Sequence, residues 1–403
     1  MMPTAAETGV LATIDAAAMQ AQTLAWSAIN SGSRNLAGLE AMAQALTTAF
    51  APLGTAALCE PAAVEAVDAA GVRRPLLHGR NLHLVQRPDA PVKVLLTGHM
   101  DTVFAADHPF QAWRWLDDNR LNGPGTADMK GGIAVMLAAL TAFEASPFAA
   151  NIGYEVVINS DEEVSSPGSA PLLAAAAARC TLGLTYEPAL PDGTLAGARK
   201  GSGNFSAVVR GRAAHAGRDP QLGRNALVAA ADLAVRLARL PTERPGISCN
   251  PAKIEGGGPN NIVPDLAVLR FNIRPTDSAD AAWATARLAE VAAAVAVAHD
   301  VVITTEGGFA RPPKPLDANQ LRLFELVRDC GDALGLPIGW RDTGGVCDGN
   351  NLAATGLAVV DTLGVRGGAI HSADEFMLVD SLAERARLSA LLLMRVAQRG
   401  WTR

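Results

Sequence analysis

Strand-like and helix-like segments alternate between residues 92 and 187, and this alternation restricts the folds that the chain can adopt. VKVLLTGHMD, from residue 92, is a short apolar run with β-branched residues that stops at a glycine, as buried strands do. KGGIAVMLAALTAFEA then has helical periodicity, and YEVVINSDEE, SAPLLAAAAARC and LGLTYEP continue the series as strand, helix and strand. This order predicts a parallel sheet covered by helices.

The pattern changes near residue 200. SGNFSAVVRGRAAHAG, LAVLRFNIRPT and VVITTEGG read as strands, and helical segments separate them. Alternation of apolar and polar residues in these strands predicts a small α+β unit whose sheet leaves one face open. The unit ends at the proline cluster RPPKP, after which the α/β character returns. We therefore predict that residues 201–312 form a small domain inserted into a larger one made of residues 1–200 and 313–403.

Composition and charge exclude several classes of protein. Hydrophobic residues make up 49% of the chain and charged residues 18%, which is typical of a globular protein. The formal charge of -6 and the lack of any Lys/Arg-rich run give no basic surface for nucleic acid. The five cysteines lie far apart, which favours a reducing compartment. The N-terminal segment lacks signal-peptide features and the apolar stretches are shorter than a membrane span, so we expect a soluble, cytoplasmic protein that does not bind membranes.

Acidic and histidine residues follow the predicted strands, where open α/β sheets place their ligands. His99 and Asp101 end the first strand, and because side chains at i and i+2 share a face, Asp101 can hold the His99 ring. Asp128 lies in GPGTADMKGG, where glycines let the backbone fold closely around an ion. Glu162 and Glu163 follow the next strand and point in different directions, so one can ligate while its neighbour faces the substrate.

Two more candidates complete this set. Glu187 stands directly before a proline, and His371 follows a Gly-Gly turn near the C-terminus. Taken alone, each of these acids is commonly a turn residue or helix cap, and each histidine a packed structural residue. The functional interpretation rests on their occurrence together.

The set contains enough ligands for two metal ions, with one carboxylate left over. Nitrogen and oxygen ligands without cysteine suit zinc, cobalt or manganese. Two metals sharing a carboxylate lower the pKa of a water molecule and polarise a carbonyl group. The remaining glutamate then moves a proton from the water to the leaving amine. The sequence thus predicts a metal-dependent amide hydrolase.

At these residues the sequence resembles a family of zinc exopeptidases and deacylases. The family includes glutamate carboxypeptidase, to which the chain is most similar, acetylornithine deacetylase, succinyl-diaminopimelate desuccinylase and aminoacylase. The matching stretches follow the family's order: TGHMDTV, GPGTADMKGG, NSDEEVSSPGS, YEP, GRAAHAG, NNIVPD, GGVCDGN and IHSADEF. The resemblance implies a zinc-exopeptidase-like α/β/α catalytic domain with an inserted α+β lid that also forms a dimer.

The resemblance also implies roles for the candidate residues. Glu162 would be the general base and Asp101 the partner of a histidine ligand. A glutamate at position 187 matches the family's carboxypeptidases and desuccinylases, whereas many aminopeptidases have aspartate there. Five residues would hold two zinc ions, with one bridging carboxylate and two ligands for each site: Asp128 as the bridge, His99 with Glu187, and Glu163 with His371.

Three residues of the predicted lid match positions that contact substrate in the family. His215 would stabilise the oxyanion, although a packed core histidine is the alternative. Asn261 and Arg274 would hold the substrate's terminal carboxylate, for which arginine offers a bidentate fork. A solvated strand residue is the alternative for Arg274.

Two positions depart from the family pattern. GGFARPP stands where glutamate carboxypeptidase has a further arginine. Arg311 lies near that position, but the sequence does not fix whether the two arginines align. It therefore leaves open whether the substrate carries glutamate. Cys347 replaces the usual hydroxyl residue in GGVCDGNN, and we expect a small buried filler rather than a nucleophile, beside an Asp348 that positions the loop.

We therefore predict a hydrolase with two Zn²⁺ ions per chain, for which Co²⁺ or Mn²⁺ can substitute. It would cleave an amide bond next to a free carboxylate in a small peptide or N-acyl amino acid, as a glutamate carboxypeptidase does, and form a homodimer through the lid. An N-acyl-amino-acid deacylase, a dipeptidase or aminopeptidase, and an inactive metal-binding scaffold are the alternatives.

Overall fold

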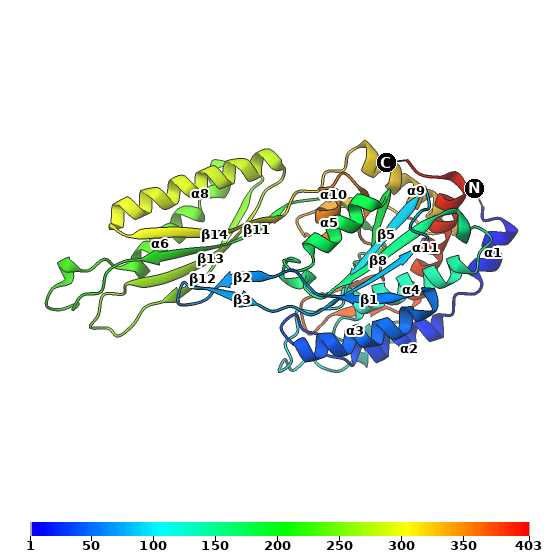
Figure 1. Cartoon of the computed structure of the whole chain (residues 1–403), viewed down its shortest axis with the longest axis horizontal. Coiled ribbons are helices and arrows are strands. Elements are labelled where there is room, and N and C mark those ends of the chain that lie inside the picture. The colour runs from blue at the N-terminus through cyan, green and yellow to red at the C-terminus, as the bar shows by residue number, and fades with distance from the viewer. Residues whose placement is uncertain (1, 403) are drawn as a thin grey trace.

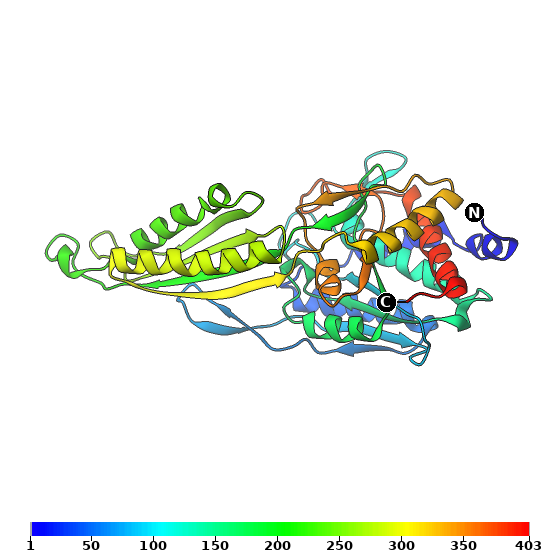
Figure 2. The same cartoon turned by 90° about the horizontal axis from the view of Figure 1, so that it is seen from above.

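The computed structural model describes residues 2–402. Its two largest sheets lie end to end along the long axis of the molecule, and each carries its own helices (Figure 1). The view from above shows the same two parts (Figure 2). The α/β fold with a smaller α+β unit that the sequence predicts is confirmed.

The larger sheet has six strands. They lie in the order β1 (Ala56–Cys59), β4 (Asn81–Gln86), β8 (Gly153–Asn159), β5 (Lys93–His99), β9 (Leu182–Thr185) and β16 (Ala358–Val360). The last four are mutually parallel, whereas β4 runs antiparallel to its neighbours β8 and β1 at one edge of the sheet. The sequence predicted only the parallel part, because β1 and β4 have few β-branched residues.

Helices cover both faces of the six-stranded sheet, and neighbouring residues of β5 show how. Leu96 packs into the core on one face, whereas Leu95 packs into the core on the other, because successive side chains of a strand point to opposite sides. Burial on both faces explains the continuous apolar run in β5. The first face carries α2 (Ala16–Ser27), α3 (Leu36–Phe50), α4 (Gly131–Glu144), α9 (Ala318–Ala333) and α11 (Asp380–Arg399), and the second carries α5 (Ala170–Arg179) and α10 (Asp348–Ala353).

The second large sheet is antiparallel. Its order is β12 (Ser248–Gly256), β13 (Leu266–Arg274), β11 (Ser202–Arg210) and β14 (Val302–Arg311), and helices α6 (Ala226–Leu237) and α8 (Ser278–His299) cover one face. Phe205 and Leu269 point to these helices, while Ser206 and Arg270, their neighbours along β11 and β13, point to the open face. Strand β12 was not predicted, because Pro251 and exposed residues break its pattern at the sheet edge.

A hairpin, here called the strap, reaches from the larger part across the open face of the four-stranded sheet (Figure 1). It consists of β2 (Val64–Val67) and β3 (Arg73–Leu76). Val67 packs there against Val208, and its carbonyl accepts a hydrogen bond from Arg270 Nη2 at 2.8 Å. The strap joins the two parts separately from the chain crossings, and the sequence did not predict it.

The chain crosses between the two parts after β10 (Leu195–Arg199), which pairs with β15 (Trp340–Thr343), and returns after β14. Arg199 and Lys314 lie at these crossings and pair through their backbones. Both side chains bind Asp361, Arg199 through Nε at 2.8 Å and Lys314 through Nζ at 2.9 Å. All three side chains are buried, so one carboxylate anchors both crossings.

The remaining elements are short. They are α1 (Ala5–Leu11), α7 (Leu240–Glu243), and a small sheet in the order β17 (Gly367–Gly368), β18 (Phe376–Leu378), β7 (Arg120–Asn122) and β6 (Arg114–Trp115). The connection from β17 to β18 belongs to the site described below.

Two helical segments, Thr126–Glu144 and Ser278–His299, are long and apolar enough to cross a membrane by length and composition. In the first, 83% of the most apolar window is buried inside the protein, and the second is α8, which packs on the four-stranded sheet. The sequence-based prediction that no apolar stretch has membrane length is wrong, because both helices extend beyond their alanine-rich runs. The absence of membrane binding stays a prediction.

Replacing Asp361 by asparagine should destabilise the protein by about 3–5 kcal/mol, because two buried cations lose their counter-charge. Although burial opposes its ionisation, Arg199 and Lys314 hold the pKa of Asp361 below its usual value. Denaturant unfolding of wild type and variant measures the difference. The exposed Asp300, which pairs with Arg224, offers a matched control, and Asp300→Asn should change stability by less than about 1 kcal/mol. Equal stability of the two variants would contradict the anchoring role.

Candidate metal centre

The predicted ligands gather at the carboxyl ends of the parallel strands. His99 is the last residue of β5, Glu162 and Glu163 lie in a short turn after β8, and Glu187 follows β9. Because parallel strands end at the same edge of a sheet, these side chains converge there. Asp128 comes from the turn before α4, and His371 from the connection between β17 and β18.

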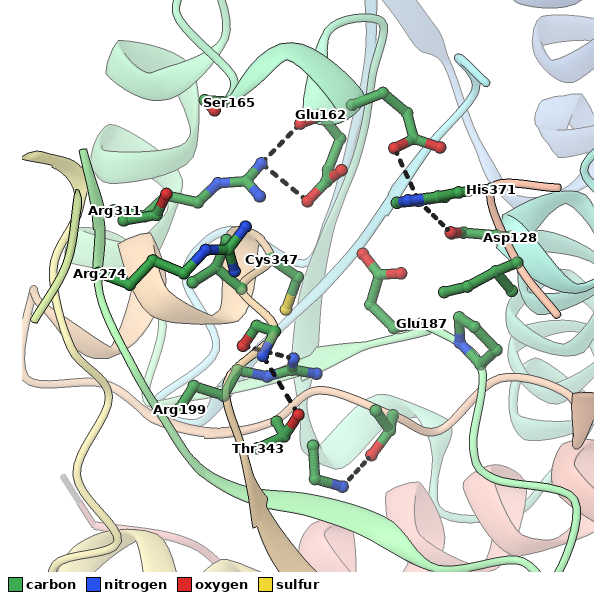
Figure 3. Close-up of a pocket in the computed structure, with 18 of the residues that line it drawn as sticks. Asp128, Glu162, Ser165, Glu187, Arg199, Arg274, Arg311, Thr343, Cys347 and His371 are labelled. Atoms are coloured by element: carbon green, nitrogen blue, oxygen red, sulfur yellow. Dashed lines mark hydrogen bonds and ion pairs between the residues drawn. The ribbon is translucent and has the colours of Figure 1, made fainter. Parts of the chain in front are cut away.

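Asp128 lies between His99 and His371, and Figure 3 shows its contact with His371. Its Oδ1 is 3.1 Å from Nε2 of His99, and its Oδ2 is 3.2 Å from Nε2 of His371. Glu163 Oε2 lies 3.1 Å from the same His371 nitrogen, and Glu187 Oε1 lies 3.8 Å from the same His99 nitrogen. The structure therefore brings all five predicted ligands together, as two groups that share one carboxylate.

The donor set fits divalent cations. The side chains of Asp128, Glu162, Glu163 and Glu187 are each at most 10% exposed. Burial and the charge of Asp128 raise the pKa of Glu163 to about 7, and burial raises that of Glu187. Oε1 of Glu187 has no hydrogen-bond partner among residues 2–402. Carboxylates buried so close together are stable as anions only with cations among them, and histidine nitrogen with carboxylate oxygen suits zinc.

Asp101 holds two parts of the site at once. Nδ1 of His99 lies 3.0 Å from the Asp101 carbonyl oxygen and 3.3 Å from its Oδ1. A proton on Nδ1 leaves Nε2 free to bind a metal. The Asp101 carboxylate also accepts the backbone N–H groups of Glu162 and Glu163, at 3.1 and 3.2 Å. It therefore fixes the turn that carries both glutamates. The sequence did not predict this second role of Asp101.

Glu375 supports the turn that carries Asp128, and sequence reasoning missed it. Its carboxylate is buried and accepts the backbone N–H groups of Gly125, Ala127 and Asp128 at 3.2, 3.0 and 3.0 Å. Burial raises its pKa to about 8. Glu375 lies in the stretch IHSADEF, but no spacing rule connects it with a turn some 250 residues earlier.

A cavity of about 550 Å³ opens over the ligands. Its walls carry arginines, among them Arg274 and Arg311, that face the acidic cluster (Figure 3). Arg274 Nη1 donates to the Gly344 carbonyl at 2.8 Å, which places the guanidinium at the cavity wall. Arg311, whose register the sequence left open, lies beside Glu162. The cavity thus combines the acidic cluster of candidate metal ligands with arginine side chains whose charge suits an anionic group.

Two predicted contact residues lie outside this cavity. Strand β11 begins at Ser202 in the cavity wall and runs away from it for nine residues, about 25–30 Å at 3.3 Å per residue. His215 follows the far end of β11, where its Nδ1 accepts the N–H of Gly217 at 3.1 Å. Asn261 lies beside it, with its carbonyl bound by the N–H of Ala216. The structure does not bring His215 and Asn261 to the ligands of the same chain.

The loop that contains Cys347, the residue that differs from the family pattern, packs against the cavity. Cys347 is buried, its Sγ accepts the N–H of Gly349 at 3.3 Å, and burial raises the pKa of its thiol. The Asp348 carboxylate accepts a hydrogen bond from Asn159 at 2.6 Å and another from Ser166. These contacts agree with a small filler at 347 and a loop held by Asp348.

Comparisons with known proteins agree with this geometry. The family model described as Peptidase family M20/M25/M40 matches residues 95–395. Carboxypeptidase G2 of Pseudomonas sp. (strain RS-16) is 30% identical over 313 residues, which cover 75% of this chain and 73% of the relative. Succinyl-diaminopimelate desuccinylase of Maricaulis maris (strain MCS10) is 28% identical over 380 residues, covering 87% and 93%.

Solved structures show the same fold. A tripeptidase from Staphylococcus aureus superposes with a TM-score of 0.72 at 24% identity, covering 96% of this chain and 100% of the other. An M20 family metallo-carboxypeptidase from Sulfolobus solfataricus superposes with a TM-score of 0.70 at 14% identity, covering 94% and 99%.

Replacing Glu375 by glutamine should weaken metal binding, because the amide places N–H groups against the backbone donors that now hold the Asp128 turn. Loss of such a supporting contact typically lowers metal affinity by about 10–100-fold. Titration of metal-free protein with Zn²⁺ in a calorimeter measures the change. Asp374 is the exposed neighbour, and Asp374→Asn should leave the affinity unchanged. An unaltered affinity in Glu375→Gln would contradict the supporting role.

Proposed function

The chain belongs to peptidase family M20/M25/M40, and from this membership and the geometry of its site we propose that it is a two-zinc carboxypeptidase. Membership makes it a metallopeptidase or deacylase. In the proposed reaction it cleaves an amide bond next to a free carboxylate in a small peptide or N-acyl amino acid.

The observation that carries the proposal is the position of Asp128 between two histidines. Each of its carboxylate oxygens faces a different imidazole nitrogen, at 3.1 and 3.2 Å. A carboxylate in that position suits a bridge between two cations. His99 and Glu187 would complete one site, and Glu163 and His371 the other. Two cations held there would polarise the scissile carbonyl and lower the pKa of a water molecule.

The protein's own groups then account for proton transfer and orientation. Glu162 lies beside the ligands in the cavity, and it takes a proton from the attacking water and delivers it to the leaving amine. Asp101 keeps its backbone in place through the N–H of Glu162. Arg274 faces the cluster from the cavity wall, where its guanidinium can bind the substrate carboxylate through two parallel hydrogen bonds. The cavity volume of about 550 Å³ is in the range of small-molecule sites.

His215 and Asn261 enter this proposal through a second chain. They lie beyond the far end of β11, so they can reach a metal centre only if it belongs to another copy. A homodimer formed through the four-stranded sheet and its helices would place His215 against the oxyanion and Asn261 against the carboxylate of the partner's substrate. The four-stranded sheet and its helices would then serve as lid and dimer contact together.

An N-acyl-amino-acid deacylase is the second candidate. Its support is the desuccinylase relative, of which 93% is covered by the similarity. Both candidates share the same bond chemistry and differ in which part of the substrate is recognised. A dipeptidase or aminopeptidase would differ in requiring a free amine on the substrate.

Incubation of zinc-loaded protein with folyl-glutamate, N-acetyl-glutamate, N-succinyl-diaminopimelate and unblocked dipeptides, followed by product separation, tests the proposal. We expect cleavage of a substrate with a free carboxylate, loss of turnover after chelation, and recovery with Zn²⁺. Glu162→Gln is the matched control and should keep its metals while kcat falls by about 10²–10⁴. Turnover that survives complete metal removal, or no cleavage of any of these compounds, would reject the proposal.

His215→Ala should lower kcat by about 10²–10³ with a smaller change in KM, because an oxyanion donor acts mainly in the transition state. To test action across a dimer, the His215→Ala and Glu162→Gln dimers are dissociated, mixed in equal amounts and allowed to reassociate, so that half of the new dimers contain one chain of each variant. Each mixed dimer would hold one complete site out of two, and the mixture should therefore recover about a quarter of wild-type turnover. Steady-state kinetics of the singles and the mixture measures both effects. No recovery on mixing would mean that His215 does not act across a dimer.

A further inference from the structure

Arg311 is the point at which the four-stranded sheet reaches the catalytic glutamate. It is the last residue of β14, and its side chain is only 4% exposed in the wall of the cavity. Nη2 lies 2.7 Å from Oε1 of Glu162 and donates to the Glu162 backbone carbonyl, also at 2.7 Å (Figure 3). One guanidinium nitrogen therefore contacts both the carboxylate and the backbone of the same residue.

The other contacts of Arg311 keep it in place without Glu162. Nη2 also lies 3.2 Å from Ser166 Oγ and 3.7 Å from Asp348 Oδ1. Ser166 in turn donates to Asp348, whose second oxygen is held by Asn159 at 2.6 Å. This buried network belongs to the six-stranded part, and it fixes the guanidinium from behind. Arg311 can therefore position the Glu162 carboxylate.

Glu162 needs such a restraint because it is chemically able to be a metal ligand. Oxygen and nitrogen atoms of Glu162, His99 and Glu187 lie within 4.8 Å of one another, as do those of Glu163, His99 and Asp128. Two adjacent glutamates thus both stand at binding distance from a shared histidine. Asp101 holds the backbone of both, but it does not distinguish their side chains.

Their side-chain partners do distinguish them. Glu163 Oε2 lies 3.1 Å from His371, whereas Glu162 Oε1 faces the cation of Arg311 and has no hydrogen bond of good geometry from residues 2–402. A cation on one side competes with a metal on the other for the same carboxylate oxygens. The ion pair with Arg311 draws Glu162 toward the cavity wall, while Glu163 stays with the ligands.

We propose that Arg311 is the positioning residue that keeps Glu162 out of the metal coordination sphere, so that of two neighbouring glutamates one binds metal and the other remains free as the base. This rests on the proposed two-metal function. Without the arginine, Glu162 turns toward His99 and Glu187 and becomes an additional ligand.

Cobalt-substituted protein tests this directly, because the visible absorption of Co²⁺ reports coordination geometry and needs no substrate. In Arg311→Gln we expect a spectrum altered toward higher coordination number at an unchanged Co²⁺ content. Adding Glu162→Gln to that variant should return the spectrum to that of the Glu162→Gln single variant, because the extra ligand is gone. Arg244 pairs with Asp280 on the four-stranded part, and Arg244→Gln is the matched control with an unaltered spectrum.

Kinetics supplies a second readout. Arg311→Gln should lower kcat by about 10²–10³ while KM changes by less than about 5-fold, since the loss falls on the base. Arg311→Lys should recover part of both the wild-type spectrum and the wild-type kcat. It replaces Arg311→Gln in both measurements if the glutamine variant does not fold.

A cobalt spectrum of Arg311→Gln identical to wild type overturns the proposal whatever its turnover, and so does a change that persists in the double variant with Glu162→Gln. If wild type cleaves none of the substrates tested, the proposed function fails while the spectroscopic test still decides the role of Arg311.

Discussion

Mutual repulsion among buried carboxylates is the constraint on which the rest of this structure depends. Asp128, Glu162, Glu163 and Glu187 are nearly inaccessible to water and lie within a few ångströms of one another. Such a cluster is unfavourable in a low dielectric unless each charge has a partner. The histidines and the guanidinium of Arg311 each offset part of this repulsion, and divalent cations held by the donor set would offset more of it. The positions of these groups follow from that requirement.

A second layer of residues holds the cluster together against its own charge. Asp101 and Glu375 are themselves acidic, yet both face backbone N–H groups, which stabilise an anion without adding a mobile cation. Each of them fixes a turn that carries a ligand. The positions of the candidate ligands thus depend on two carboxylates that bind the main chain of the turns and need not contact a metal themselves.

The fold of the parallel strands and the convergence of their terminal acids could be predicted from the sequence, because both are local patterns. Strand β5 is a continuous apolar run, and His99 and Asp101 stand at its end. Glu375 and Arg311 could not be placed in this way, since each acts on a turn more than 140 residues away in the chain. The strap and β12 were missed for a different reason. Their residues are largely exposed, so their sequences lack the apolar pattern that a strand prediction needs.

The contacts of the strap connect these long-range features. The strap touches β11 and β13 through Val67, and Arg73 pairs with Glu306 of β14, the strand that ends at Arg311. Just after Arg311, the chain returns to the larger part beside Lys314, which Asp361 holds. Strand β14 is thus restrained both along its length and where it ends. The last residue of this strand, Arg311, is held by Glu162, Ser166 and Asp348 of the six-stranded part, so β14 connects the four-stranded sheet directly with the residue proposed as the base.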